Sequence, residues 1–225
     1  EKHDQVLLHK QFGEVALTLS GNGGANVRIY HAFTGYLIWE SKLHSIADGL
    51  LPVPGFQAAD AAFLTEGATA ERPPDVVVIS NAQTVRRLDG AYGQEVWKWQ
   101  PEDDISRRSL IRVIANKDKI HVVSLVRNAG STYSSLSVST LSAHNGQLLA
   151  THDIPSGLSS AADVVVVAWS TLPNLPPTAN PGSWVAWLNK DGTVRAAPLD
   201  PPSKRFAQPQ VVYPKRPEST FTGLV

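Results

Sequence analysis

The sequence predicts an all-β fold, a partial β-propeller whose blades are four-stranded antiparallel sheets. Apolar residues come in short β-branched runs separated by Gly, Pro, Asn and Asp. No stretch keeps the i, i+3, i+4, i+7 spacing of an amphipathic helix over three turns. One motif recurs at a spacing near 50 residues, which is typical of a propeller blade, so the 225 residues hold about four to five blades.

The predicted strands follow the apolar runs in chain order, each bounded by turn-forming residues. They are Val15–Ser20, Asn26–Tyr30, Tyr36–Lys42, Asp75–Ser80, Thr84–Leu88, Gln94–Trp99, Leu110–Ala115, Ile120–Val126, Ser135–Leu141, Gln147–Asp153, Val164–Trp169, Ser183–Leu188 and Thr193–Ala197. Single helical turns are predicted in Ser106–Leu110 and Ser156–Ala162. Irregular connections are predicted at Leu51–Pro74, Leu172–Pro181 and Pro198–Pro217, since the prolines of the last two remove ladder donors.

The repeated motif has four copies, the last of them weaker. They read HAFTGYLIW (31–39), DGAYGQEVW (89–97), SAHNGQLLA (142–150) and LNKDGTVRA (188–196). The shared glycines, Gly35, Gly93, Gly146 and Gly192, stand 58, 53 and 46 residues apart. A hairpin tip of this length needs a left-handed residue, so we expect a positive φ at each of them.

Two further positions of the motif indicate how blades pack. The residue three before the glycine is small, which lets neighbouring backbones approach; these residues are Ala32, Gly90 and Ala143. Four residues after the glycine, Trp39 and Trp97 are large enough to fill the space between adjacent sheets, a burial worth about 1.5–3 kcal/mol or more each. The third and fourth copies have alanine there, so either the docking differs or another aromatic residue, such as Trp184 or Trp187, compensates.

Composition argues against several functional classes. Lys+Arg and Asp+Glu are both 20, so no net charge draws the chain to nucleic acid or anionic lipid. A cysteine count of 0 excludes disulfides, thiolate nucleophiles and zinc-thiolate sites. A methionine count of 0 indicates a processed or excised piece, so any targeting signal is expected outside it. No apolar run approaches the ~20 residues of a membrane span.

The polar motifs favour turns and solvated faces over chemistry. The Gly-rich segment 21–24 is followed by a predicted strand and no Lys-Ser/Thr pair, which favours a turn over a phosphate loop. The acidic run 102–104 lacks the alternating oxygen ligands of a calcium loop. The histidines, His31 and His144 among them, lack metal-ligand spacing, and no G-x-S-x-G elbow occurs. We therefore predict no catalytic, cofactor-binding or metal-binding residue.

The pattern small-x-x-Gly-x-x-x-Trp resembles the tryptophan-docking motif of pyrroloquinoline-quinone-like β-propellers, whose blades are WD40-like and whose members include enzymes and scaffolds. Three segments resemble a narrower family, LSGNGGANVR (19–28), NAQTVRRLDG (81–90) and GQEVWKW (93–99). They are similar to the lumenal propeller region of the first and largest subunit of the ER membrane protein complex, in a fungal-type version. The resemblance runs from about Val15 to Ala197.

This resemblance implies a non-catalytic scaffold in the ER lumen, part of a type I membrane protein. The complex inserts tail-anchored and multi-spanning proteins, so sister subunits and clients are the implied partners. Residues 1–197 would form propeller blades, and 198–225 a Pro-rich connection into a further blade or tail. A closed propeller of seven or eight blades needs well over 300 residues at ~40–50 per blade. An open arc of blades would expose strand edges, and self-association of the isolated piece is expected.

Two alternatives share the docking motif. A quinone-dependent dehydrogenase would place a vicinal cysteine pair against its cofactor and supply ligands to calcium, and the chain has no cysteine. A bacterial envelope assembly scaffold is also non-catalytic. The full-length gene separates the readings, because a C-terminal membrane helix favours the ER subunit and an N-terminal lipobox favours the envelope protein.

Overall fold

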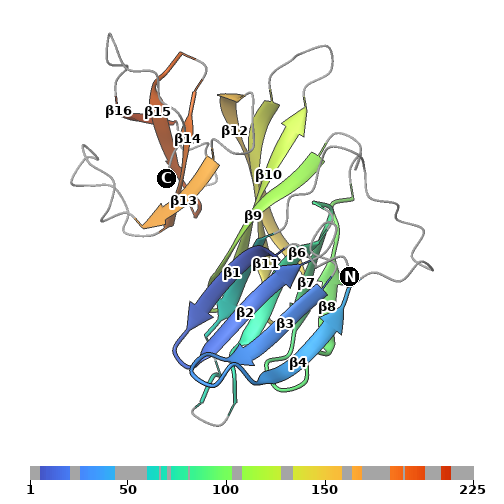
Figure 1. Cartoon of the computed structure of the whole chain (residues 1–225). Coiled ribbons are helices and arrows are strands. Elements are labelled where there is room, and N and C mark those ends of the chain that lie inside the picture. Colours follow the sequence, from blue (N-terminus) through green and yellow to red (C-terminus); the bar gives the residue numbers. More distant parts are fainter. Residues whose placement is uncertain are drawn as a thin grey trace. The chain divides into compact units, whose positions relative to one another are not determined.

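A computed structural model of the chain describes residues 6–20, 26–43, 60–65, 67–69, 72–80, 82–102, 108–127, 134–158, 164–168, 183–189, 191–200 and 209–213. These ranges contain strands and turns, arranged in four-stranded sheets in which each strand is bonded to its neighbour in sequence (Figure 1). A membrane-spanning helix is not found in these ranges. The all-β expectation is confirmed, and the four sheets resemble the blades of a propeller.

The first two sheets are antiparallel meanders. The first consists of β1 (Val6–Phe12), β2 (Val15–Ser20), β3 (Asn26–His31) and β4 (Leu37–Lys42). The second consists of β5 (Asp60–Leu64), β6 (Asp75–Ser80), β7 (Thr84–Leu88) and β8 (Glu95–Trp99). Every residue of β6 is buried, because this apolar strand is covered on both faces.

The remaining strands form the third and fourth sheets. The third sheet consists of β9 (Arg108–Asn116), β10 (Lys119–Arg127), β11 (Ser134–Ser142) and β12 (Leu148–Leu158). The fourth consists of β13 (Val164–Ala168), β14 (Ser183–Leu188), β15 (Val194–Pro198) and β16 (Gln210–Tyr213). On β14, Trp184, Val185, Ala186 and Trp187 are all buried.

The chain divides into two compact units. The first contains residues 1–122 and 141–149, and the second contains residues 123–140 and 150–225. Two apolar clusters lie within the first unit. One joins the first and second sheets around Leu17, Ile29 and Val78, and the other joins the second sheet to strands of the third around Ile79 and Ile120. The second sheet therefore buries one face against the first sheet and its other face against the third.

Three strands differ from the sequence prediction, and so do the described parts of the two segments in which a helical turn was predicted; residues 106–107 and 159–162 lie outside the described residues. β1 was not predicted, β5 lies inside the segment Leu51–Pro74 that we expected to be irregular, and β16 lies inside Pro198–Pro217. Each is an edge strand of its sheet, paired on one side only, and its sequence carries a weaker apolar pattern than the central strands. Residues 108–110 and 156–158 are strand, because β9 begins at Arg108 and β12 extends to Leu158. The predicted connection Leu172–Pro181 lies outside the described residues.

The four repeat glycines have the left-handed backbone predicted for them. Their φ angles are 71° at Gly35, 70° at Gly93, 72° at Gly146 and 79° at Gly192. In the first three hairpins the glycine N–H donates to the carbonyl four residues earlier, at 2.8–3.0 Å; these bonds are Gly35 to His31, Gly93 to Asp89 and Gly146 to Ser142. The fourth hairpin, in the weakest copy of the motif, is one residue tighter, with the Gly192 N–H donating to the carbonyl of Asn189.

Candidate functional site

Trp39 of the first sheet docks on the hairpin tip of the second sheet. Its indole nitrogen donates to the carbonyl oxygen of Gly90 at 2.8 Å, and the ring lies over Gly93. A Cβ on Gly93 would stand 2.7 Å from Cδ2 of the ring, closer than real Cβ contacts. Trp39 is only 7% exposed. The glycine of one motif therefore receives the tryptophan of the motif before it.

Trp97 repeats this arrangement one blade further along. Its indole nitrogen donates to the carbonyl oxygen of Ala143 at 3.0 Å, and a Cβ on Gly146 would meet ring atoms of Trp97 at 2.7 Å. The side chain is 9% exposed. We call such a hairpin tip a docking seat. It is formed by the carbonyl group of the small residue and by the side of the glycine where other residues carry a Cβ. The seats at Gly90/Gly93 and Ala143/Gly146 are both occupied.

A β-bulge before each tryptophan aims its ring. On β4, Trp39 pairs with Ile29, and the next pair skips a residue, so that Tyr30 pairs with Leu37. On β8 the same shift separates the Trp97–Arg87 pair from the Leu88–Glu95 pair. The extra residue lies three positions after the hairpin glycine, and its side chain is exposed in both strands, 40% at Ile38 and 49% at Val96. A bulge of this kind re-aims the side chains beside it, here the two indoles.

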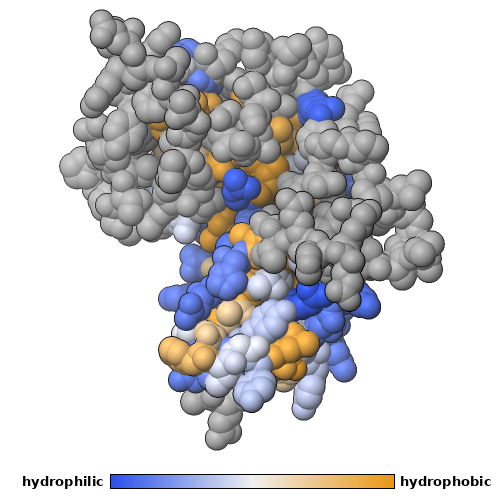
Figure 2. Space-filling model, viewed as in Figure 1, coloured by the Kyte–Doolittle hydropathy of each residue, from blue (hydrophilic) through white to orange (hydrophobic). Residues whose placement is uncertain are grey.

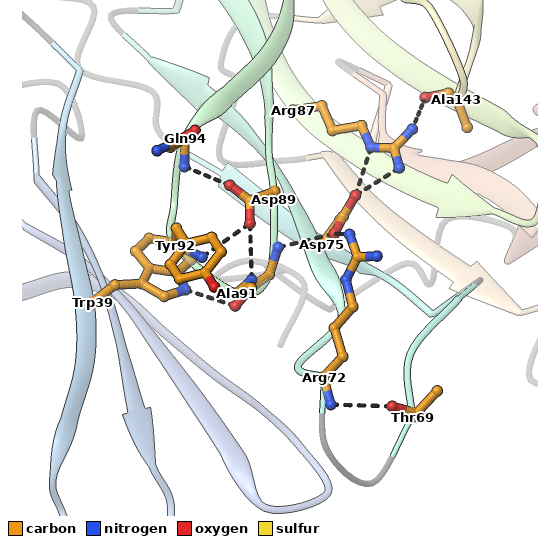
Figure 3. A network of polar contacts seen from close by, with 11 residues as sticks. Trp39, Thr69, Arg72, Asp75, Arg87, Asp89, Ala91, Tyr92, Gln94 and Ala143 are labelled. Atoms are coloured by element: carbon orange, nitrogen blue, oxygen red, sulfur yellow. Dashed lines mark hydrogen bonds and ion pairs between the residues drawn. The ribbon is translucent and has the colours of Figure 1, made fainter.

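A buried carboxylate holds the first seat in place (Figure 3). The N–H of Gly90 donates to Oδ1 of Asp75 at 2.9 Å, and Arg87 donates to Oδ2 through Nε at 2.8 Å and Nη2 at 2.6 Å. Arg72 adds a third cationic contact at 3.3 Å. The Asp75 side chain is 5% exposed, and the loss of its hydration is offset by two guanidinium groups and a peptide N–H.

The same arginine connects the two seats. Nη1 of Arg87 donates to the carbonyl oxygen of Ala143 at 2.6 Å, the same oxygen that receives the indole N–H of Trp97. A continuous hydrogen-bonded path therefore runs from Trp39 through Gly90, Asp75, Arg87 and Ala143 to Trp97. We call this path the seat network. It joins strands of three sheets within the first unit.

A second buried carboxylate links the first strands of the same three sheets, β1, β5 and β9. Asp60 on β5 accepts a hydrogen bond from Nζ of Lys10 on β1 at 3.1 Å, and one from the backbone N–H of Val113 on β9 at 2.9 Å. Lys10 also donates to the carbonyl oxygen of Ala61. Asp60 is 7% exposed. The three sheets are thus joined to one another at their first strands as well as at their hairpin tips.

The remaining motif residues behave differently. Gly35 forms a hairpin tip, yet a Cβ there would meet no described atom within 4 Å. Trp184 and Trp187 are buried, but their indole nitrogens have no hydrogen-bond partner in the described ranges, so they do not reproduce the bond of Trp39 and Trp97. The positions corresponding to tryptophan, Ala150 and Ala196, offer no ring. Sequence reasoning found the two tryptophans and the glycines but missed Asp75, Arg87 and Asp60, which no spacing rule distinguishes from surface charges.

Two titratable groups of the described ranges, His152 and Asp191, have shifted pKa values. No group of three or more His, Asp or Glu residues there is placed to hold a metal ion, and residues 103–107 lie outside these ranges. Burial lowers the pKa of His152 on β12, against the opposing charges of Asp153 and Asp200 and a hydrogen bond to the Pro198 carbonyl. Hydrogen bonds from Thr193 lower the pKa of Asp191, whose carboxylate caps the fourth hairpin tip.

Solved structures that resemble this chain belong to longer proteins. The quinohemoprotein alcohol dehydrogenase of Comamonas testosteroni has a TM-score of 0.53 and 13% identity over 92% of this chain and 34% of its own, and the Pseudomonas putida HK5 enzyme ADHIIG has 0.52 and 9% over the same shares. BamB of Moraxella catarrhalis has 0.44 and 15%, over 85% of this chain and 47% of its own. The chain thus spans about a third to a half of their lengths.

Comparison with curated proteins gives no match. In contrast, the sequence family described as the EMC1 N-terminal beta-propeller domain matches residues 1–195. This range includes all four copies of the motif except the last residue of the fourth, and both occupied docking seats. The chain therefore belongs to the EMC1 N-terminal β-propeller family.

Proposed function

We propose that this chain is a non-catalytic scaffold domain of the ER membrane protein complex and lies in the ER lumen. The observation that carries the proposal is the use made of its buried polar residues. Asp75 binds the N–H of Gly90 and the guanidinium of Arg87 within its own sheet. Arg87 and Asp60 in turn bind groups of neighbouring sheets, the Ala143 carbonyl for Arg87 and Lys10 and the Val113 N–H for Asp60. Such groups make a rigid support, because a fully satisfied buried network fixes one arrangement of the elements that it joins.

The proposed partners are the sister subunits of the complex, with client proteins as transient partners. Family membership supports this, since an EMC1 domain implies EMC subunits as neighbours. The surface contains exposed apolar side chains of the kind that protein contacts bury, including Phe33 and Tyr92, each 76% exposed. Figure 2 shows hydrophilic and hydrophobic residues mixed over the β1–β4 sheet. The role in inserting tail-anchored and multi-spanning proteins would thus be indirect, through assembly.

We further propose that residues 1–197 are blades and that 198–225 form a connection toward a further blade or tail. This segment contains β16, which pairs with β15 as the outer strand of the fourth sheet. An open series of blades would also let the isolated piece self-associate through uncovered strand edges.

The scaffold proposal is tested in the full-length protein in ER membranes. An affinity-tagged parent is compared with a Trp39→Ala/Trp97→Ala variant, and with Glu40→Gln as a matched control beside Trp39 on the same strand. We expect the double variant to lose co-purified sister subunits and, in parallel, to reduce insertion of a tail-anchored reporter, while the control retains both. Full recovery of the subunits with the double variant, after protease digestion has shown its propeller to be unfolded, would contradict the proposal. Dye reduction by the parent with pyrroloquinoline quinone and calcium would favour an enzyme instead.

A further inference from the structure

Large apolar side chains are concentrated on the surface of the first hairpin. Phe33 and Tyr36 are 76% and 75% exposed, and Leu37 and Ile38, at the start of β4, are 51% and 40% exposed. These are four of the ten exposed large apolar residues of the described ranges, and they lie within six positions. We call these four side chains the hairpin patch. Exposed apolar groups that stand together in this way mark an interaction site.

Docking of a neighbouring blade leaves the strand part of this patch uncovered. At the second hairpin the docking seat is occupied, yet Val96, the counterpart of Ile38, is 49% exposed. At the third hairpin the seat is also occupied, and the counterparts of Leu37 and Ile38, Leu148 and Leu149, are 45% and 53% exposed. A partner for these positions therefore comes from outside the series of blades.

β4 presents an open backbone edge beside these side chains. Among the described strands it is hydrogen-bonded to β3 alone, so it is an edge of the first sheet (Figure 1). Alternate N–H and C=O groups of an edge strand point away from the sheet and can pair with another strand. The bulge makes Ile38 the extra residue, so that two consecutive residues, Leu37 and Ile38, expose apolar side chains at this edge. An open edge with exposed apolar side chains is what a sheet uses to bind an extended peptide.

The outer strands of the second and third sheets lack this combination. On β8, Glu95 stands at the position of Leu37, and its carboxylate is paired with Arg86. β12 contains Pro155, which has no N–H to donate to an added strand. The hairpin before β12, SAHNGQ (142–147), contains no Phe, Tyr or Trp. The first sheet is therefore the one whose outer edge favours strand addition.

The charges along β4 indicate what an added strand would contain. Glu40 is paired with Arg28 on β3 at 3.0 Å, so its charge is already balanced. Lys42, at the far end of the strand, is exposed and has no ion-pair partner among the described residues. Opposite charges that face each other across two strands are favourable. An acidic residue of the partner therefore fits opposite Lys42, and apolar residues fit beside Leu37 and Ile38.

We propose that β4 and the hairpin patch bind an extended segment of a sister subunit, which adds a fifth strand to the first sheet. The segment has large apolar side chains beside Leu37 and Ile38 and an aspartate or glutamate opposite Lys42. Main-chain hydrogen bonds supply the affinity, and the alternate side chains supply the specificity. This inference rests on the proposed scaffold function, because it assigns one surface and one mode of recognition to the subunit contacts proposed there.

A second copy of this chain fits the same edge poorly. In a twofold antiparallel pairing along the whole of β4, Lys42 of each copy stands opposite Leu37 of the other, and no acidic residue meets it. A register one residue shorter places Glu40 opposite Glu40, and like charges directly opposite are destabilising. Only a register that leaves Leu37 and Ile38 uncovered brings Glu40 opposite Lys42.

Site-specific photo-crosslinking in the full-length protein within its complex identifies the partner. Benzoylphenylalanine replaces Ile38, or Val96 as the matched position of β8. We expect the Ile38 probe to crosslink to one peptide of a sister subunit that contains large apolar residues and an aspartate or glutamate. The Val96 probe should not reach this peptide. A third probe at Tyr92, expected to reach the strand that holds Trp39, shows that crosslinking works.

With the Tyr92 probe working, several results at Ile38 would overturn the inference. They are a crosslink to lipid, to a second copy of this protein or to another part of its own polypeptide, a subunit peptide without an acidic residue, and no crosslink. Failure of the scaffold proposal differs from all of these, because then no sister subunit would co-purify with the parent. If only the present inference is wrong, the subunits co-purify and Ile38 does not reach them.

Hydrogen exchange in the same assembled complex tests the strand pairing itself. After correction for sequence, the main-chain N–H groups of β4 should exchange about tenfold or more slowly than those of β8, whose outer edge stays open. Ile38→Glu should remove this difference, and Val96→Glu should preserve it. Equal exchange of β4 and β8 in the parent complex would show that no strand pairs with β4.

A charge exchange tests the predicted partner of Lys42. Lys42→Glu should reduce the Ile38 crosslink about threefold or more, whereas Lys98→Glu, at an exposed position of β8, should leave it unchanged. Changing the acidic residue of the crosslinked peptide to lysine should then restore the crosslink of the Lys42→Glu variant. An unchanged crosslink in Lys42→Glu, or no restoration by the second change, would contradict the proposed pairing.

Discussion

The indole nitrogen of Trp39 donates to the carbonyl oxygen of Gly90, 51 residues along the chain, at 2.8 Å. The bond crosses from the outer strand of one sheet to the hairpin tip of the next. Because the motif supplies a tryptophan on one side and a seat on the other, each copy with both parts connects two neighbours. The repeated motif therefore forms contacts between neighbouring sheets in addition to forming a hairpin turn.

Removing either indole should be costly. Trp39→Ala and Trp97→Ala each lose a nearly buried ring and leave a cavity, so we expect each to lower the free energy of unfolding by about 3–5 kcal/mol. Trp39→Phe keeps most of the ring but removes the indole donor to the buried Gly90 carbonyl, a loss of about 1–3 kcal/mol. Trp97→Phe should cost less, because the Ala143 carbonyl still accepts a hydrogen bond from Arg87. Urea unfolding followed by circular dichroism measures both. Parental stability in the two alanine variants would show that these rings do not hold the sheets together.

A methyl group in an occupied seat should displace the ring. Gly93→Ala places a Cβ against the Trp39 indole and forces an L-residue into a left-handed conformation. Overpacking of this kind costs about 1–3 kcal/mol, in addition to the backbone strain. Gly13→Ala carries the strain without the collision, so it should be the milder of the two by that difference. Equal melting temperatures for the two variants would exclude close packing at the seat.

Among the charged residues, replacement of Asp75 should lower the free energy of unfolding most. Asp75→Asn leaves Arg87 partly buried with a neutral partner and directs an amide N–H toward existing donors, an expected loss of about 3 kcal/mol or more. Glu40→Gln is the control, because the Arg28–Glu40 pair spans adjacent strands at 3.0 Å with both side chains more than a quarter exposed. Exposed pairs contribute about 0–1 kcal/mol. Chemical denaturation of both variants distinguishes the two, and a smaller effect at Asp75 than at Glu40 would exclude the network as a support.

Acid should weaken the sheet around His152. Burial lowers the pKa of His152 below 6.5, so the unfolded chain takes up a proton that the folded chain resists. Stability is therefore expected to fall as the pH drops below about 6.5 toward the folded-state pKa. His152→Gln should reduce this pH dependence, whereas His144→Gln makes the same chemical change at an exposed position of the same hairpin. Unfolding midpoints at about pH 7.5 and about pH 5.5 measure it, and an unchanged slope in His152→Gln would refute the assignment.

The sequence was sufficient for the fold class, the hairpin glycines and most central strands, because each depends on local chemistry. A left-handed tip selects glycine, and a strand such as β6 is a continuous apolar run. β5 and β16 were missed because they are edge strands with weak patterns: β5 contains an aspartate and two alanines, and β16 lies among prolines. Their pairing is decided by the sheets they join and not by their own residues.

The seat network was beyond sequence reasoning for a different reason. The small residue before each glycine was interpreted as a site of close backbone approach, whereas its carbonyl is the acceptor for an indole from the preceding blade. Gly90 has a stricter requirement than Ala143, since a Cβ there would collide with the backbone carbonyl of Pro73. Contacts between residues about 50 positions apart leave no local pattern in a single sequence.

The central claim is that the two occupied seats act together through Asp75 and Arg87. A double-mutant cycle of Trp39→Phe and Trp97→Phe, measured by urea unfolding of the 225-residue chain, tests it most directly. We predict a coupling free energy of about 0.5–1 kcal/mol or more between the two substitutions, and its loss when the cycle is repeated with Asp75→Asn. Additive effects of the two substitutions, in the parent and in the Asp75→Asn background alike, would show that the seats are independent and contradict the account.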